Sequence, residues 1–430
     1  MNTKSSSLLL ALLASALLIR LIYGLSQDPL APFEQTGGDS WWYLVNGDAL
    51  VTGRIQEGSG TDVSRLPTPP GYLVLVGLAQ AVFGPTADAV MAIRVVQAVL
   101  STLIVWCGWR MAFLLSGREV VGGLAALILT ASPAFIIEPA MIASETLYMT
   151  LVALGLTAYV EAISVRPENS PVSRRLGMLA LAAVAFGLAA LTRAPILLFP
   201  VALALHLLIV YGLRGGWRRV VVLLVVYAAV VSTWTLYSAA RWGRFVIAAD
   251  GFAAFLYVGA TGWQGPQAVD ERLGSSEGGA SNQQYIEEAT ATITADLGGY
   301  VRRRVTELAE SGLQPHGTAY FSGPSLRDLA MQWLREDRSP GGLIDVVRGE
   351  FFLQKALLYV FHYGAILFGL VGLWRTRSNW RISLVLLGFI AYTLVVHLFL
   401  LALPRYLFPT LFCWTVLATA ALPRWNRRTV

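Results

Sequence analysis

Long apolar stretches separated by short polar connections recur along most of the chain. Each stretch has about 18 to 25 residues with few charged side chains, and a helix of that length crosses a hydrocarbon layer about 30 Å thick. The pattern predicts ten membrane-spanning helices, so we expect an all-α polytopic membrane protein. The predicted spans are residues 8–25, 88–115, 120–138, 145–165, 176–192, 195–213, 220–240, 355–374, 382–403 and 406–422.

The first apolar stretch, residues 8–25, follows a single lysine and is similar to the hydrophobic part of a signal peptide. No cleavage site of small residues follows it, and further spans come after it. We therefore interpret this stretch as a retained first helix.

Two shorter apolar patterns do not fit a span. Residues 71–83 would form a helix about 20 Å long, too short to cross the membrane, and prolines precede it. Residues 39–50 mix Trp41, Trp42 and Tyr43 with polar side chains, as in helices that lie at a membrane surface. We therefore expect two short surface helices in the loop after the first span.

Composition agrees with a membrane protein and changes the meaning of the net charge. Of the 430 residues, 56% are hydrophobic and 13% are charged, about half the charged share of a soluble domain. Residues 241–354 hold 14 acidic and 10 basic side chains and therefore have a net charge of −4. Because the whole chain has a net charge of +6, the remaining residues have a net charge of +10. Since the basic excess belongs to the membrane part, nucleic acid is not an expected partner.

The distribution of basic residues among the connections predicts the topology. If Lys4 is cytoplasmic, every second connection after it is rich in arginine, as the positive-inside rule requires. Both termini are then cytoplasmic. We divide the chain into an N-terminal transmembrane module (1–240) whose first outer loop is residues 26–87, an extracytoplasmic soluble segment (241–354) and C-terminal transmembrane helices (355–430).

The extracytoplasmic segment, residues 241–354, is too charged to be embedded in the membrane. Helical patterns occur at residues 283–297 and 300–311, and residues 274–280 are rich in glycine. We interpret the segment as a small soluble unit held over the bundle.

Several polar residues within apolar stretches have structural interpretations. Cys107 and Cys413 lack His or Cys neighbours at ligand spacing, so we expect them to pack in the core. Arg20 and Arg94 are candidate partners of loop acids such as Asp28 or Asp48, and Glu138 could pair with either arginine. The four histidines are interpreted as hydrogen-bonding residues rather than ligands. They are His206, His316, His362 and His397.

Four charged residues are predicted to lie together at the outer boundary of the membrane. They are Asp39, Glu145, Arg193 and Arg405. A charge at membrane depth costs a few kcal/mol unless it is paired or meets water, so charges at this boundary indicate function. Arginines can hold a phosphate through two hydrogen bonds, and a nearby carboxylate can accept a proton from an acceptor hydroxyl. This combination suits a substrate with a lipid tail and an anionic head.

Each of these residues also has a purely structural interpretation. Asp39 could cap a helix, and Glu145 could favour its helix N-terminus through the helix dipole. Arg193 and Arg405 could be anchors that reach lipid phosphates. A divalent metal could supply some of the positive charge, but with several arginines none is required, and no other cofactor is implied.

Short motifs in a fixed order resemble a family of membrane enzymes. The first outer loop contains Gly-Asp-Ser-Trp-Trp-Tyr at residues 38–43 and Arg-Leu-Pro-Thr-Pro-Pro-Gly-Tyr at residues 65–72. Later motifs are Ser-Glu at residues 144–145, Leu-Thr-Arg-Ala-Pro at residues 191–195 and Pro-Arg-Tyr-Leu-Phe-Pro at residues 404–409. Together they resemble GT-C membrane glycosyltransferases of the family 39 type, such as protein O-mannosyltransferases and lipid A aminoarabinose transferases.

The resemblance implies a fold and roles for individual residues. The fold would be the GT-C fold, with about ten transmembrane helices, outer juxtamembrane helices and an extracytoplasmic loop domain. Asp39 matches the catalytic base, and Glu145 matches an acid that orients the acceptor or the sugar. The matches to donor-phosphate contacts are Arg65, Arg193, Arg405 and Tyr406, and those to the acceptor or sugar pocket are Trp42, Tyr43 and Tyr72. The sequence departs from the protein O-mannosyltransferases at Ser40, where they have glutamate.

The resemblance also implies an activity. A sugar would pass with inversion from a polyprenyl-phosphate donor to an acceptor, on the extracytoplasmic face of a bacterial inner (plasma) membrane, with Asp39 as general base. Membrane lipids and the lipid-linked donor would be the partners, and lipid, glycan and protein acceptors all remain open. The alternative is a transporter, flippase or accessory subunit that handles lipid-linked sugars. Transporters often carry functional charges near the bilayer midplane, whereas here the charges gather at one face.

Overall fold

The computed structural model describes residues 3–35, 38–56, 59, 61–164, 171–262 and 282–423. Within these ranges the chain forms helices joined by turns, with no strand. The predicted all-α fold class is therefore confirmed. The glycine-rich stretch at residues 274–280 lies outside the described ranges.

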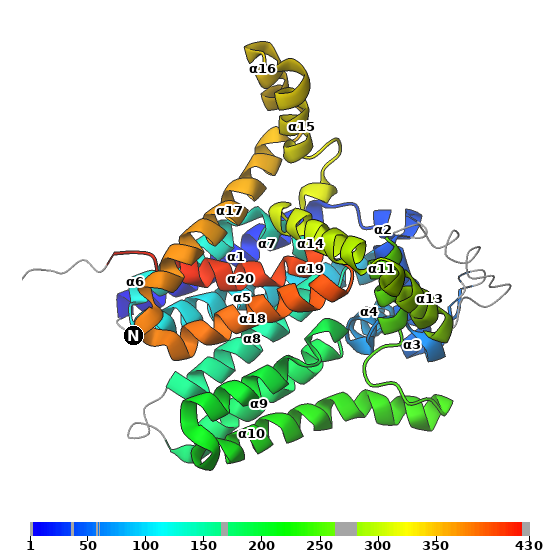
Figure 1. The fold of residues 1–430 in the computed structure, drawn as a ribbon, viewed down its shortest axis with the longest axis vertical. Helices are drawn as coiled ribbons and strands as arrows, with labels where there is room; N and C mark the ends of the chain where they lie inside the picture. Colours follow the sequence, from blue (N-terminus) through cyan, green and yellow to red (C-terminus); the bar gives the residue numbers. More distant parts are fainter. Residues whose placement is uncertain are drawn as a thin grey trace, which may run out of the picture.

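Seven helices in the described part of the chain are long and apolar enough to cross a membrane. They form the bundle shown in Figure 1. The count rises to eight if one bent pair, α6 (Glu119–Ala131) with the turn at Pro133–Ala140, is taken as one span. The seven are α1 (Thr3–Ser26), α5 (Ala87–Ser116), α8 (Glu145–Ser164), α9 (Val172–Ala190), α10 (Phe199–Trp242), α17 (Phe352–Arg375) and α18 (Trp380–Phe399).

The count of ten spans is not confirmed among the described residues, although the reversal predicted between the sixth and seventh spans is present. Two predicted spans, residues 195–213 and 220–240, are continuous within α10, which folds back at Gly212 with a positive φ of 67°. Glycine adopts this conformation without steric cost. The Tyr227 hydroxyl donates to the Leu197 carbonyl at 2.7 Å, so the two halves of α10 lie side by side.

The last predicted span, residues 406–422, is also different. The helical hydrogen-bonding pattern is interrupted after Phe408, between the short α19 (Pro404–Leu407) and α20 (Pro409–Thr419), although Phe408 itself keeps helical φ and ψ angles. Pro409 cannot donate the backbone hydrogen bond that would join them. As a helix of eleven residues, α20 is about 16 Å long, which is shorter than the hydrocarbon layer.

A bend divides the predicted third span. Ser132 is extended, with φ −67° and ψ 121°, and Pro133 opens α7 (Pro133–Ile137) at an angle of 63° to α6. The missing N–H of Pro133 explains the break. The bend places Glu138 in a buried turn, η2 (Glu138–Ala140), rather than at the end of a straight helix.

The first outer loop contains the two short helices that the sequence predicts, α3 (Asp39–Thr52) and α4 (Pro70–Phe83). They pack against each other at two glycines: a Cβ added at Gly77 would lie 2.2 Å from the carbonyl oxygen of Gly47. The helices α3 and α4 lie at the end of the bundle opposite the N-terminus of α1 (Figure 1). The remaining elements of this loop are α2 (Ala31–Glu34) and η1 (Val63–Arg65).

A backbone hydrogen bond fixes the start of α4. The N–H of Gly71 donates to the carbonyl of Leu191 at 2.6 Å. A Cβ at Gly71 would lie 2.7 Å from that same carbonyl oxygen, so only glycine permits this approach. The bond joins the first outer loop to the turn that carries Arg193.

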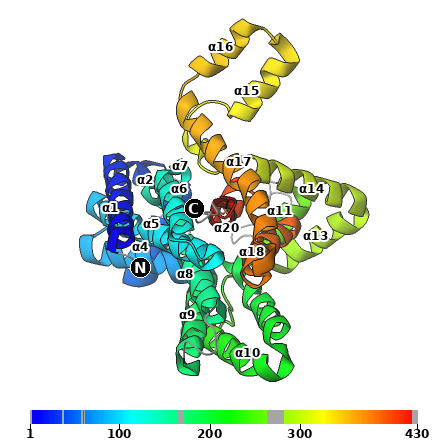
Figure 2. The same ribbon diagram turned by 90° about the vertical axis from the view of Figure 1, so that its left-hand side faces the viewer.

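The segment at residues 241–354 is helical where the structure describes it. The predicted helices at residues 283–297 and 300–311 are confirmed as α13 and α14. Figure 2 shows α15 and α16 extending beyond α17, away from the other helices, while α14 lies beside α18. The elements are α11 (Phe252–Thr261), α13 (Asn282–Ala295), α14 (Leu297–Leu313), η5 (Thr318–Tyr320), α15 (Leu326–Gln332), η6 (Trp333–Asp337) and α16 (Pro340–Arg348).

Small residues let the helices of the bundle approach closely. A Cβ added at Gly372 of α17 would lie 1.7 Å from the carbonyl oxygen of Leu417 in α20. Such contacts are typical of helix packing in membranes. Cys107 and Cys413 are buried and free, as expected. The tight contact with α17 fixes α20, and with it the preceding α19.

Candidate active site

Asp39 is the first residue of α3 and pairs with an arginine far away in the sequence. Gly38 before it takes the N-cap position in an extended conformation, and no side chain caps the helix there. The Asp39 carboxylate instead accepts a hydrogen bond from the guanidinium of Arg405. The Asp39 side chain is 60% exposed. It is therefore a surface carboxylate held by an arginine rather than a helix cap.

Glu145 and Arg193 form a second, deeper ion pair. Glu145 opens α8, and Arg193 precedes the short turn η4 (Ala194–Ile196). Arg193 Nη1 lies 2.5 Å from Glu145 Oε1, and the two side chains are 15% and 4% exposed. Arg193 also donates to the Ser144 hydroxyl at 3.4 Å. A buried charge requires a partner, so Arg193 is bound within the protein rather than extended toward lipid.

Tyr406 joins the two ion pairs. The guanidinium carbon of Arg193 lies 4.9 Å from the centre of the Tyr406 ring, and that of Arg405 lies 5.2 Å from it. Both distances are within the range of cation–π attraction. Asp39, Glu145, Arg193, Arg405 and Tyr406, which we call the ion-pair cluster, therefore come together from four remote segments of the chain.

The cluster keeps its arginines charged. Burial alone would lower the pKa of Arg405, but the neighbouring Tyr406, Glu145 and Asp39 outweigh it and raise the pKa above its ordinary value. Arg193 behaves in the same way: burial opposes its charge, and chiefly Glu145 raises its pKa. Both guanidiniums can therefore bind an anion at any physiological pH.

Tyr43 supports the cluster from α3. Its hydroxyl donates to the Ser144 hydroxyl at 3.1 Å, next to Glu145. Burial, with a further contribution from the charge of Glu145, raises the pKa of Tyr43 to about 12. Tyr43 thus remains a neutral hydrogen-bond donor beside the ion pair.

Trp42 and Tyr72 pack on either side of Tyr43. Their rings meet the Tyr43 ring edge to face, with centroids 5.3 Å and 4.8 Å apart. Tyr72 is fully buried, and its hydroxyl donates to Gln97 Oε1 at 3.0 Å. Tyr72 therefore supports Tyr43 from the interior and does not line an open pocket, while Trp42 is half-buried.

Arg65 is not brought to the cluster. Its side chain is 70% exposed in η1, and its Nε lies 3.9 Å from a carboxylate oxygen of Asp62. The loop around it is held by Arg244, which donates to the carbonyl of Ser64. The geometry therefore separates Arg65 from the arginines that the sequence grouped with it.

A second buried cluster was not found from the sequence. Glu138 Oε2 accepts a hydrogen bond from the Tyr320 hydroxyl at 3.0 Å and lies 2.5 Å from His316 Nε2. Burial and the Glu138 charge raise the pKa of Tyr320. The expected pairing of Glu138 with Arg20 or Arg94 is wrong. No sequence signal links Glu138 to residues about 180 positions later.

Arg20 and Arg94 are bound elsewhere. Arg20 donates to the Ser101 hydroxyl at 2.7 Å and to two backbone carbonyls. Arg94 donates to the carbonyls of Ala140 and Gln27 at 2.9 and 2.8 Å. Both guanidiniums therefore bind backbone carbonyls instead of the acidic side chains that the sequence suggested as their partners.

The described residues contain no group of three or more His, Cys, Asp or Glu side chains that could hold a metal ion. The carboxylates of the ion-pair cluster face guanidiniums instead. Directly beside Arg193, a small cavity of about 10 Å³ is lined by aromatic residues, and it has room for about one water molecule. Its aromatic and imidazole walls are Tyr148, Tyr392, His397 and Tyr406.

Comparison with known proteins gives a fold. No protein-family model matches the sequence, and no curated protein matches it. The structure matches an oligosaccharyltransferase from Archaeoglobus fulgidus in its apo form, with a TM-score of 0.55 over 96% of this chain at 14% identity. An archaeal oligosaccharyltransferase from the same organism, AglB, in complex with an inhibitory peptide and a dolichol-phosphate gives a TM-score of 0.56 over 97% of the chain at 13% identity. The chain has a GT-C fold.

The chain spans about half the length of these two oligosaccharyltransferase structures, since each match covers 50% of the other chain. ArnT from Cupriavidus metallidurans bound to undecaprenyl phosphate also matches, with a TM-score of 0.44, 14% identity, and coverage of 96% of this chain and 77% of ArnT. With its long apolar helices and this fold, the protein is an integral membrane protein.

Proposed function

We propose that this protein is a membrane glycosyltransferase that moves a sugar from a polyprenyl-phosphate-linked donor to an acceptor. The observation that carries the proposal is the ion-pair cluster: two arginine–carboxylate pairs come from four segments of the chain, and both arginines contact the ring of Tyr406. A donor phosphate needs positive charge, and the transfer needs a base.

Arg405 is the first candidate for holding the donor phosphate. Its Nε is buried and has no hydrogen-bond partner among the described residues, so one donor is free for an incoming oxygen. Its other nitrogens donate to Asp39 and to the Tyr406 hydroxyl. Binding of a phosphate at Arg405 would loosen the hold on Asp39 and free that carboxylate beside the sugar.

The proposed reaction is a single displacement. Asp39 accepts the proton of the acceptor hydroxyl while that oxygen forms a bond to the anomeric carbon. The bond between that carbon and the phosphate oxygen breaks on the opposite face, which inverts the configuration. The electron pair leaves with the phosphate, whose charge is stabilised by Arg405 and Arg193.

Glu145 has a different role from Asp39 in the proposed reaction. Its side chain is nearly fully buried and pairs with Arg193. Glu145 therefore orients Arg193 and balances its charge, and Tyr43 with Ser144 supports that pair. Arg65 is left out of the donor site, because it is exposed and does not contact the cluster.

The comparison with AglB supports the donor class. AglB shares the fold, and its solved complex contains a dolichol-phosphate and an inhibitory peptide. A polyprenyl-phosphate sugar is therefore the donor that we propose, and the acceptor remains open among lipids, glycans and proteins. We further propose that transfer takes place at the extracytoplasmic face of a bacterial inner membrane, with both termini in the cytoplasm.

The experiment that tests this function is sugar transfer by purified protein in lipid vesicles. Radiolabelled polyprenyl-phosphate sugars would be offered with lipid, glycan and peptide acceptors. Asp39→Asn should lower transfer by about 10²- to 10⁴-fold, because it removes the proton acceptor. Asp62→Asn, an exposed acid of the same loop, is the matched control and should transfer at the wild-type rate.

The outcomes separate the candidate functions. Wild-type turnover by Asp39→Asn would refute the assignment of the base. Tight binding of polyprenyl phosphate without transfer from any donor would favour a transporter, flippase or accessory subunit that handles lipid-linked sugars.

A further inference from the structure

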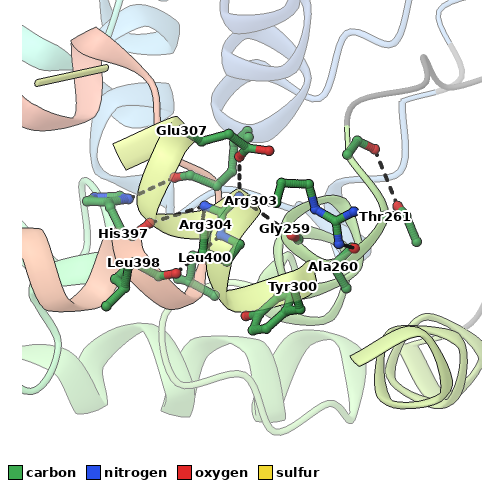
Figure 3. Close-up of polar contacts among 12 residues, drawn as sticks. Gly259, Ala260, Thr261, Tyr300, Arg303, Arg304, Glu307, His397, Leu398 and Leu400 are labelled. Carbon is green, nitrogen blue, oxygen red and sulfur yellow. Dashed lines mark hydrogen bonds and ion pairs between the residues drawn. The ribbon is translucent and has the colours of Figure 1, made fainter. Parts of the chain in front are cut away.

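Arg304, on α14 of the outer segment, makes an unusual set of contacts with the end of a spanning helix. Its side chain is almost fully buried. Its guanidinium donates to the carbonyls of His397 and Leu398, each at 3.2 Å, and to the carbonyl of Leu400 (Figure 3). These three carbonyls lie at the C-terminal end of α18.

Elementary helix chemistry explains this arrangement. The last carbonyls of a helix have no partner within the helix, and a cation is favourable at that end because of the helix dipole. Arg304 supplies both the donors and the charge. The hydroxyl of Tyr300, on the same face of α14, donates to the remaining carbonyl of Phe399 at 3.2 Å. Glu307 accepts a hydrogen bond from Arg304 and balances its charge (Figure 3). The end of α18 is thus bound to α14.

Arg303, the neighbouring residue, has a different target. It donates to the carbonyl of Ala260 at the end of α11 and makes no hydrogen bond to α18 within the described residues. Arg304 also reaches α11, where its Nη1 lies 3.5 Å from the carbonyl oxygen of Gly259, so the two arginines differ in their contacts with α18 (Figure 3). This makes Arg303 a matched control for Arg304.

The chain that leaves α18 leads directly to the ion-pair cluster. The His397 ring is stacked on the Tyr406 ring, with centroids 5.1 Å apart and planes at 21°, and its Nδ1 lies 3.0 Å from the carbonyl of Leu401. Tyr406 in turn contacts Arg193 and Arg405. The position of the α18 end thus determines the position of α19.

The outer segment also contacts the far side of α19. The His316 ring packs on Phe408 with centroids 4.4 Å apart, while its Nε2 lies against Glu138. Arg304 therefore holds the chain on the N-terminal side of α19, and His316 contacts it on the C-terminal side. Between these two contacts lie Arg405 and Tyr406.

We propose that Arg304 and His316 are positioning residues: α14 and the turn after it hold α19 from both sides so that Arg405 and Tyr406 can bind the donor phosphate. The phosphate part rests on the proposed function. The positioning of α19 by α14 does not, because it follows from the contacts alone.

The test uses the full chain in lipid nanodiscs and compares Arg304→Gln, Arg304→Lys and His316→Ala with Arg303→Gln. Two quantities are measured: hydrogen–deuterium exchange of the backbone over residues 398–408, and affinity for a polyprenyl phosphate without sugar. Arg304→Gln should speed exchange in that stretch and weaken binding about tenfold, the usual effect of losing hydrogen bonds to a charged group. Arg304→Lys keeps the charge but replaces the planar guanidinium with a compact ammonium group, so it should recover only part of both. Arg303→Gln should match the wild type.

For transfer, the donor KM should rise in Arg304→Gln while the acceptor KM stays unchanged, a split that general loss of stability would not produce. Faster exchange with wild-type affinity would overturn the link to phosphate binding. Unchanged exchange in Arg304→Gln and His316→Ala would overturn the positioning itself. If Arg304→Gln does not fold, His316→Ala decides both points. If the wild type neither binds polyprenyl phosphate nor transfers sugar, the proposed function fails, and exchange alone decides whether α14 holds α19.

Discussion

Two carboxylates of the same cluster differ in exposure, and this difference separates their roles. Asp39 is mostly exposed and pairs with the partly exposed Arg405, so its carboxylate is available to a substrate. Glu145 is nearly fully buried and tied to Arg193. An exposed ion pair adds little to stability, whereas breaking a buried pair leaves an uncompensated charge in the interior.

Replacement of the buried acid should therefore cost stability. Glu145→Gln leaves the Arg193 guanidinium buried without its counter-charge and should lower the free energy of unfolding by about 3 kcal/mol. Asp39→Asn should change it by less than about 1 kcal/mol. Thermal unfolding of both variants in the same detergent measures the contrast, and equal losses of stability would contradict it.

Replacement of Tyr406 tests whether its ring holds the two arginines of the cluster. Tyr406→Phe keeps an aromatic face for both arginines and should bind polyprenyl phosphate nearly as well as the wild type. Tyr406→Leu removes the cation–π contacts, each worth about 1 kcal/mol, and should weaken binding at least fivefold. Equal affinity of the two variants would show that the ring does not hold the arginines.

The helices α3 and α4 together determine where Asp39 lies. The sequence predicted both helices, because tryptophans and prolines mark them. It could not predict that their backbones touch, since Gly47 and Gly77 are remote in sequence and carry no side-chain signal. The reversal of α10 at Gly212 agrees with the two predicted spans at residues 195–213 and 220–240, but the sequence could not predict that so short a turn joins them.

The contact between α3 and α4 can be tested at Gly77. A Cβ there would meet backbone atoms of α3, which cannot move aside alone, so Gly77→Ala should separate the helices and displace Asp39. We expect a loss of about 1 to 3 kcal/mol in the free energy of unfolding and a marked loss of transfer. Gly123→Ala is the control, because nothing lies within 4 Å of a Cβ at that position. Equal behaviour of the two variants would argue against a tight contact.

For the whole molecule, the sequence predicted the all-α class and the gathering of Asp39, Glu145, Arg193 and Arg405, because alternation of the spans places the ends that bear these four charges at the same face. It could not predict which carboxylate pairs with which arginine. It also missed Glu138 with His316, since those residues meet only through the fold. The division at residues 240 and 354 and the predicted sidedness stay predictions.

Sidedness can be measured with single cysteines, because Cys107 and Cys413 are buried and should not react. Asp328→Cys in the outer segment should react with a membrane-impermeant maleimide added to intact cells. Ser378→Cys, in the exposed turn between α17 and α18, should react only after the membrane is opened. The reverse pattern would invert the topology and place the ion-pair cluster in the cytoplasm.

The bond between Gly71 and Leu191 has a consequence for how a substrate enters. On that side of the cluster, a backbone hydrogen bond and a contact that excludes any side chain fasten α4 to the turn bearing Arg193. On the other side, α3 and α19 are joined by the partly exposed pair of Asp39 and Arg405, which costs little to separate. The cluster should therefore open between α3 and α19. The headgroup of an arriving lipid-linked substrate would then contact the Asp39 carboxylate at the entrance of the site, before it reaches the buried pair of Glu145 and Arg193.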